Sequence, residues 1–112
     1  MNGEMRELGE LGFLILIALG GGPAHGYAIG KEVKARSGGR LDATTGALYQ
    51  ALRRLRDAQL VQPSDGPERA VDARRKYFEL TAAGRRAVGA EARRLEALVS
   101  AARERKLYPA KV

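Results

Sequence analysis

The chain has 112 residues, a length that suits one small domain with a core of its own. It contains no cysteine, which excludes disulfides, thiolate catalysis and cysteine metal sites and is compatible with the cytoplasm, where we expect the protein to reside. The formal net charge is +7, and residues 1–39 carry as many acidic as basic side chains, so the whole excess lies in the rest of the chain. Such an excess is typical of proteins that bind polyanions.

The first predicted element is an apolar helix at residues 8–19, preceded by a polar segment at residues 1–7 that we expect to be frayed. Its unbroken apolar run falls far short of the roughly 20 residues that a membrane helix needs, so we predict no membrane association. A signal peptide is the alternative, but it would begin with positive charge, and three glutamates precede the run here. The broad apolar surface suggests that a partner subunit shelters part of this helix.

Three consecutive glycines and Pro23 end the first helix and turn the chain. A triple glycine can also form a phosphate loop, but no strand precedes it and no Lys-Ser/Thr pair follows, so we favour the turn. A second helix is predicted over residues 24–37. It would bury Ile29 and Val33 with part of Tyr27, which we assign to the core, and two further glycines end it.

The third predicted helix lies within residues 42–61 and has two different faces. Leucines at three-and-four spacing form the buried face, and Asp42 or Thr44 caps the N-terminus. The opposite face lacks the Glu and Lys of an ordinary solvated surface, which indicates a recognition helix. Tyr49 could simply pack, but its position opposite the leucines favours DNA contact. The predicted DNA-reading residues are Thr44, Thr45, Gly46, Tyr49, Gln50 and Arg53.

A β-wing is predicted after the third helix. Leu60 and Val61 begin an extended segment, a turn-rich stretch follows, and residues 75–80 alternate like a short half-buried strand. Basic side chains at the tip and base of such a wing would meet a phosphate backbone, and their position favours this over plain solvation. These bases are Arg69, Arg74, Arg75 and Lys76.

Thr81 is the predicted N-cap of the last helix, which runs from Ala82 to about Arg105 and precedes a loose tail. Its apolar residues recur at alternating four-and-three spacing. A helix of roughly 36 Å is longer than this domain can cover, so we expect it to pack against a second copy. The stripe consists of Val88, Ala92, Leu95, Leu98, Val99 and Ala102.

The order of helix, helix, recognition helix, wing and long helix brings together motifs that resemble those of the PadR family of transcriptional regulators. The resemblance covers roughly residues 8–105, and the length fits the small subgroup with a single C-terminal helix. The motifs are HGYAI (25–29), GALY (46–49), LRRL (52–55), LV (60–61) and RKYFELTAAG (75–84).

The resemblance implies a mainly α fold with a small β-wing, comprising a winged helix-turn-helix DNA-binding domain (residues 1–80) and a C-terminal dimerisation helix and tail (residues 81–112). It implies a homodimeric repressor that binds double-stranded DNA at a palindromic operator, and it leaves a small-molecule effector open. Dimerisation in the family uses the C-terminal helix with the partner's first helix. On this chain that surface comprises Leu11, Leu14 and Ile15 together with the stripe of the last helix.

The sequence departs from the family pattern at the end of the third helix and in the last helix. Gln59 stands where the family usually has Gly, which predicts a different cap at the end of the third helix. The last helix contains no tryptophan, which argues against the aromatic sandwich that holds flat ligands between subunits in some relatives.

Catalysis has no candidate residues, because the sequence shows no paired carboxylates, nucleophile–base pair or nucleotide loop. We therefore predict neither an enzyme nor a cofactor. His25, the only histidine, is a poor metal ligand by itself and should cap or pack the second helix. The competing hypothesis is a winged-helix protein-interaction module that has lost DNA binding. Its recognition face would tend to turn acidic or apolar, unlike the face found here.

Overall fold

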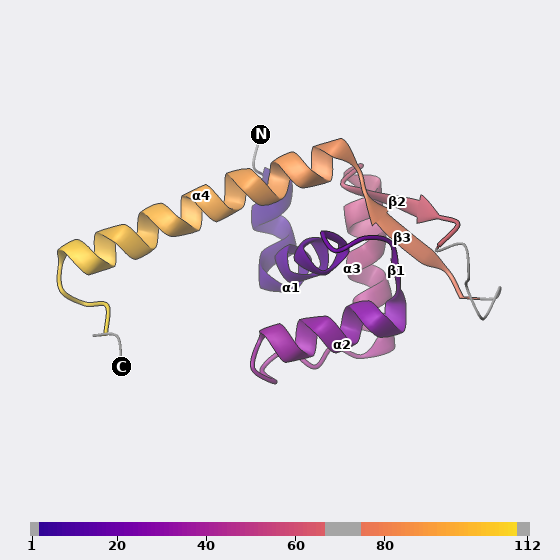
Figure 1. Cartoon of the computed structure of the whole chain (residues 1–112), viewed down its shortest axis with the longest axis horizontal. Helices are drawn as coiled ribbons and strands as arrows, with labels where there is room; N and C mark the ends of the chain where they lie inside the picture. Colours follow the sequence, from indigo (N-terminus) through magenta and orange to yellow (C-terminus); the bar gives the residue numbers. More distant parts are fainter. Residues whose placement is uncertain (1–2, 67–74, 110–112) are drawn as a thin grey trace.

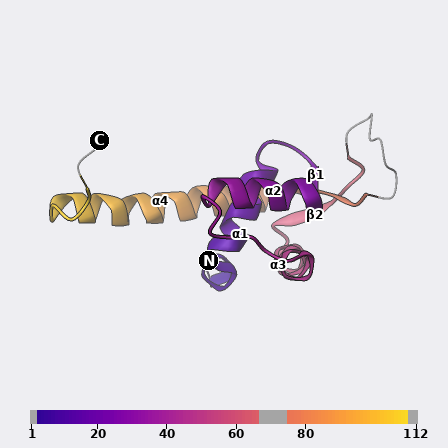
Figure 2. The ribbon, with the colours of Figure 1, turned by 90° about the horizontal axis from the view of Figure 1, so that it is seen from below.

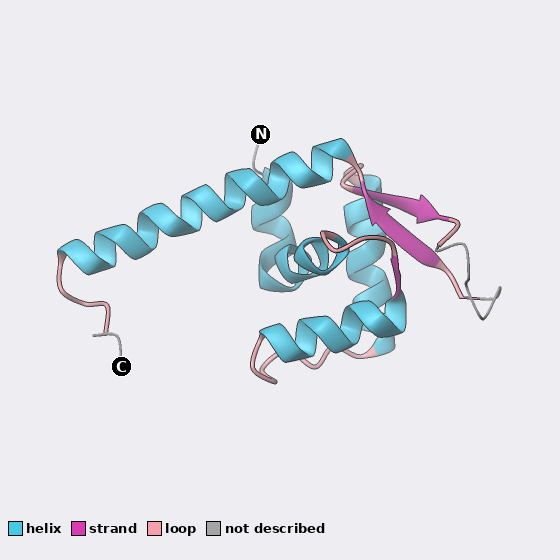
Figure 3. Ribbon diagram, viewed as in Figure 1, coloured by secondary structure: helices cyan, strands magenta, loops and turns pink. Residues whose placement is uncertain are grey.

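The computed structural model describes residues 3–66 and 75–109, with the side chains of residues 3–8 outside that description. Within these ranges four helices accompany a three-stranded antiparallel sheet (Figures 1 and 3). This confirms the predicted class, a mainly helical fold with a small β-wing. The elements are α1 (Gly3–Leu19), β1 (Ala24–His25), α2 (Gly26–Arg36), α3 (Thr45–Asp57), β2 (Val61–Ser64), β3 (Tyr77–Leu80) and α4 (Ala82–Glu104).

Helix α1 is the centre of the packing and contacts α2, α3 and α4. Its residues Ile15, Leu16 and Leu19 are almost completely buried. The helical segment begins at Gly3 rather than at residue 8, so the expectation of a frayed start was wrong from Gly3 onward. Its backbone breaks at Gly9, where φ is 63°, a value that glycine adopts without steric cost. None of the helices in the described ranges is both long and apolar enough to cross a membrane.

Helix α2 begins at Gly26, two residues later than predicted, because Ala24 and His25 form a strand instead. In this strand, β1, Ala24 lies opposite Phe78 of β3 and His25 lies opposite Tyr77. A strand of two residues has no periodicity to detect. Its pairing depends on a segment some 50 residues away, and therefore on the tertiary fold.

The sheet has the order β1-β3-β2, so β3 is its central strand. The predicted turn-rich stretch begins later than expected, because β2 continues through Ser64 and pairs Pro63 with Phe78. Proline has no N–H to donate to a ladder, and it is tolerated here because β2 is an edge strand.

Helix α3 ends at Asp57, and Gln59, the residue after the C-cap Ala58, closes it with a φ of 63° in the left-handed region. The Leu60 N–H donates to the Leu55 carbonyl and the Gln59 N–H to the Arg56 carbonyl, both at 2.9 Å, which is the Schellman pattern. Gly38 closes α2 in the same way, with a φ of 64°. The prediction of a different cap was therefore wrong. Glutamine takes the conformation that suits glycine, at a cost of roughly 1–2 kcal/mol.

Thr81 joins the end of α3 to the start of α4. Its hydroxyl donates to the Gln59 carbonyl at 2.7 Å and accepts from the Gly84 N–H at 2.9 Å, which confirms its role as N-cap. Its own N–H donates to the Leu60 carbonyl at 3.1 Å. Gly84 is buried against that same carbonyl, so closely that a Cβ would overlap the oxygen.

Helix α4 runs from Ala82 to Glu104, within one residue of its predicted end. Its first half packs on the core through Ala83, Ala87 and Val88, and its second half projects away from the other elements (Figures 1 and 2). The projection raises the radius of gyration to 15.4 Å, above the roughly 13 Å of a compact chain of this length.

We expect Gly84→Ala to lower the free energy of unfolding by about 1–3 kcal/mol, because the new methyl group meets a backbone oxygen that cannot move alone. Gly89→Ala is the matched control in the same helix. No described atom lies within 4 Å of its added Cβ, and it should raise stability by roughly 0.5–1 kcal/mol through helix propensity. Urea unfolding at one fixed protein concentration measures both changes. Equal effects of the two substitutions would contradict a close approach at Gly84.

Candidate nucleic-acid interface

The outer face of α3 is open over most of the predicted recognition residues. Thr44 is the N-cap, with its Oγ1 accepting the Ala47 N–H at 3.1 Å. Asp42, the alternative cap, instead forms an ion pair with Lys34 at 3.4 Å. The side chains that remain exposed on this face are those of Thr45, Gln50 and Arg53, and Gly46 lies among them with no described atom within 4 Å of a built Cβ.

Tyr49 lies at the border of this face rather than at its centre. Its ring meets Phe78 of β3 edge-on, with centroids 6.3 Å apart, and it is 36% exposed. Its hydroxyl lies against Gly26, where a Cβ would come within 2.5 Å of the oxygen. Tyr49 therefore joins α3 to α2 and to the wing sheet, a packing role that sequence reasoning set aside. The motifs HGYAI and GALY, which contain Gly26 and Tyr49, are the sequence signal that could have indicated this contact.

Beside α3, the wing forms one wall of a cavity of about 470 Å³ that opens along the helix. Arg53 and Arg56 line it from α3, and Arg75 and Lys76 line it from the start of the wing strand. The structure thus brings three of the predicted DNA-contacting bases to one groove, together with Arg56, which sequence reasoning missed. The predicted wing bases Arg69 and Arg74 lie outside the described residues.

His25 connects α2 to the wing, and the cap predicted for it is confirmed. Its Nδ1 accepts the Ala28 N–H at 3.2 Å, and its Nε2 lies 2.6 Å from a guanidinium nitrogen of Arg75. A neutral imidazole has one acceptor nitrogen, so it cannot accept from both groups at once. Burial, and then the charge of Arg75, lowers the pKa of His25 below its ordinary value, which keeps the ring neutral at pH 7.

Tyr27 is 71% exposed, so its assignment to the core was wrong. Two residues along a helix correspond to a rotation of about 200°, which places Tyr27 opposite the buried Ile29. Its ring instead lies beside Lys31, whose ammonium nitrogen is 6.0 Å from the ring centroid.

The predicted dimerisation residues divide into three groups. Leu14 and Ile15 were wrongly placed on a contact surface, because both are buried in the core of the single chain. Leu11 and Val88 are half-buried and pack against that core. The remaining residues lie on α4 outside the described core cluster, and Leu98 is 56% exposed. They are Ala92, Leu95, Leu98, Val99 and Ala102.

A sequence model of the transcriptional regulator PadR-like family matches residues 15–90. The chain belongs to this family. PadR-family proteins are DNA-binding transcription regulators with a winged-helix fold, and as a family they are not enzymes. Among the described residues of this member, no group of three or more His, Asp or Glu side chains could hold a metal ion.

Solved structures of similar fold come from several organisms. A PadR-family transcription regulator from Clostridium difficile has a TM-score of 0.72 at 24% identity, covering 86% of this chain and 97% of that one. A PadR-like transcription factor from Bacteroides fragilis has a TM-score of 0.69 at 25% identity, covering 89% and 93%. RosR from H. salinarum has a TM-score of 0.65 at 30% identity, covering 85% and 77%.

One curated protein with a longer chain is similar in sequence to most of this chain. It is an uncharacterised 37.1 kDa protein in transposon TN4556 of Streptomyces fradiae, 44% identical over 79 residues, which is 70% of this chain and 21% of that protein. The present PadR-family chain thus spans about a fifth of that relative's length.

The lowered pKa of His25 predicts a pH dependence of stability. Its pKa in the unfolded chain is near 6.5, and the folded pKa is lower. The unfolded state therefore binds more protons in this range, and stability should fall as the pH drops below about 6.5. His25→Asn keeps an acceptor for the cap but does not titrate. Thermal midpoints from pH 7.5 to 5 should therefore fall less in this variant, and parallel curves for the two proteins would exclude His25 as the cause.

Proposed function

We propose that this PadR-family protein is a homodimeric repressor that reads a palindromic operator with the outer face of α3. The observation that carries the proposal is the uncovered recognition surface of that helix. Gly46 has open space above it, and Gln50 and Arg53 extend beside it into solvent. An exposed glycine within a helix costs stability relative to alanine. If another molecule must approach this surface closely, the missing side chain of Gly46 would compensate for that cost.

Charge supports the same assignment. The cavity between α3 and the wing contains four basic residues and one acidic residue, Asp65. No carboxylate in the described part of the chain forms an ion pair with Arg53. An excess of cations in a groove attracts a polyanion and steers its approach. We assign Arg75 and Lys76 to the phosphate backbone and Thr44, Thr45, Gly46, Gln50 and Arg53 to the major groove, with Tyr49 at its edge.

The second half of α4 supports the homodimer. Its apolar stripe continues past the last contact with the core, and Leu98 in particular remains exposed. A second copy would cover this stripe and relate two α3 helices by a twofold axis. Recognition helices arranged in this way read half-sites roughly 34 Å apart. We accordingly propose residues 1–80 as the DNA-binding domain and residues 81–112 as the dimerisation segment. Repression and release by a small molecule enter the proposal through the family resemblance alone.

The first test concerns DNA reading. Genomic fragments retained by the purified protein define the operator, and fluorescence anisotropy then measures affinity. Arg53→Ala should cost about 1–3 kcal/mol on that operator and relax the preference at one position per half-site. Arg54→Ala is the charge-matched control, because Arg54 is exposed on the same helix but does not line the cavity beside the wing. Gly46→Ala should weaken binding while leaving the fold intact or more stable.

Wild-type affinity in both Arg53→Ala and Gly46→Ala would show that this face does not read DNA. The competing hypothesis, a winged-helix module that contacts proteins through the same surface, would then be favoured.

The second test concerns the dimer. Leu95→Asp combined with Val99→Asp should give a monomer at micromolar concentration, because two charges in an apolar interface are costly to desolvate. Both residues lie outside the described core cluster, so the helical circular dichroism should persist. Ala97→Asp places one charge on the exposed side of the same helix and should leave a dimer. Light scattering measures the molar mass of each variant in solution. A monomeric wild-type protein would refute the dimer.

A further inference from the structure

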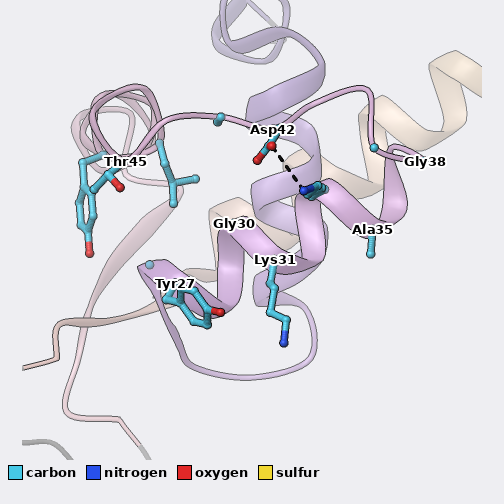
Figure 4. A pocket seen from close by; sticks show the side chains of 13 residues that line it. Tyr27, Gly30, Lys31, Ala35, Gly38, Asp42 and Thr45 are labelled. Carbon is cyan, nitrogen blue, oxygen red and sulfur yellow. Dashed lines mark ion pairs between the residues drawn. The ribbon is translucent and has the colours of Figure 1, made fainter.

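His25 lies at the junction of β1, α2 and β3. It is the last residue of β1, the N-cap of α2 and the register partner of Tyr77 in β3. The Tyr77 ring meets the imidazole edge-on, with centroids 5.4 Å apart. Tyr27, which extends from the first turn of α2 (Figure 4), stacks on the imidazole with centroids 6.4 Å apart. These two aromatic rings restrict how the imidazole can turn.

The imidazole also contacts Arg75, which precedes β3. Its Nε2 lies 2.6 Å from a guanidinium nitrogen, whereas its Nδ1 lies 3.2 Å from the Ala28 nitrogen. A neutral ring has one acceptor nitrogen, so each tautomer serves one of these donors. With the proton on Nδ1 the ring accepts from Arg75, and with the proton on Nε2 it accepts from the Ala28 N–H. The shorter contact favours the tautomer that accepts from Arg75.

A neutral acceptor holds a guanidinium without cancelling its charge. A carboxylate in its place would form an ion pair, as Asp42 does with Lys34 at 3.4 Å (Figure 4). Arg75 lines the cavity between α3 and the wing, and His25 does not. A guanidinium has five N–H donors, so one can point to His25 while others point toward the cavity. The imidazole is therefore placed to fix the direction of a cation whose charge it leaves intact.

We infer that His25 is a positioning residue for DNA binding, which holds Arg75 in the orientation that contacts the phosphate backbone. This role rests on the proposed function, in which Arg75 contacts a phosphate. An arginine side chain loses rotamer freedom when a phosphate fixes it. A side chain that His25 already holds has lost part of that freedom in the free protein, so binding costs less. His25 thus raises the affinity through Arg75 rather than through a charge of its own.

The first measurement needs no DNA and follows the imidazole nitrogen NMR shifts at neutral pH. His25 is the only histidine, so its signals are unambiguous, and the wild-type ring should carry its proton mainly on Nδ1. In Arg75→Ala the Ala28 N–H remains as the donor, so the proton should move to Nε2. Lys76→Ala removes the neighbouring base and should keep the wild-type tautomer. An unchanged tautomer in Arg75→Ala would overturn the inference.

The second measurement is a double-mutant cycle on the recovered operator and on an unrelated duplex. His25→Asn keeps an acceptor for the cap of α2 but lacks the Nε2 that meets Arg75. It should weaken both duplexes about threefold for each wing, roughly tenfold for the dimer. The salt slope should not change, because no charge is lost. The same substitution should have no further effect in an Arg75→Ala background and its full effect in a Lys76→Ala background.

An equal loss in the Arg75→Ala background would show that His25 acts on the fold instead, and wild-type affinity of His25→Asn would also overturn the positioning role. Arg53→Ala separates this role from the function on which it rests. If Arg53→Ala loses the operator while Arg75→Ala binds like wild type, the reading face stands and only the wing contact and its positioning are wrong. If Arg53→Ala and Gly46→Ala both bind like wild type, the proposed function itself is wrong.

Discussion

The burial of α1 is the constraint on which the rest of this small fold depends. The helix is apolar around most of its circumference, so α2, α3 and α4 must each cover part of it. This requirement turns the leucine face of α3 inward and leaves its opposite face in solvent. The open outer face of α3 thus follows from the packing of α1, which does not itself lie on that face.

Close approaches at glycines then determine how the elements are joined. Gly26 admits the hydroxyl of Tyr49, which ties α3 to α2 and, through Phe78, to the wing sheet. Gly84 admits the Leu60 carbonyl, which ties the end of α3 to the start of α4. Both contacts link α3 to a neighbouring element. Helix α3 is therefore held in its first half and just after its end by contacts that a single methyl group would disturb.

The described cations on this surface differ in whether a carboxylate lies beside them. Lys34 and Arg36 neutralise nearby carboxylates, and Arg40 pairs with Glu10 of α1. Arg53 and Lys31 have no such partners among the described residues. A count of basic residues does not make this distinction, because it depends on which carboxylates fold alongside them.

The sequence by itself determined what is local: the periodicity of α3 and α4, the cap at Thr81 and the inward leucine face, and it narrowed the cap of α3 to Asp42 or Thr44. Such features depend on residues a few positions apart. Only the tertiary structure decided the strand at Ala24 and the burial of Ile15 within its own chain. It also decided that Tyr49 packs on Gly26. Each depends on a contact between segments distant in sequence, and no local pattern encodes which segments will meet.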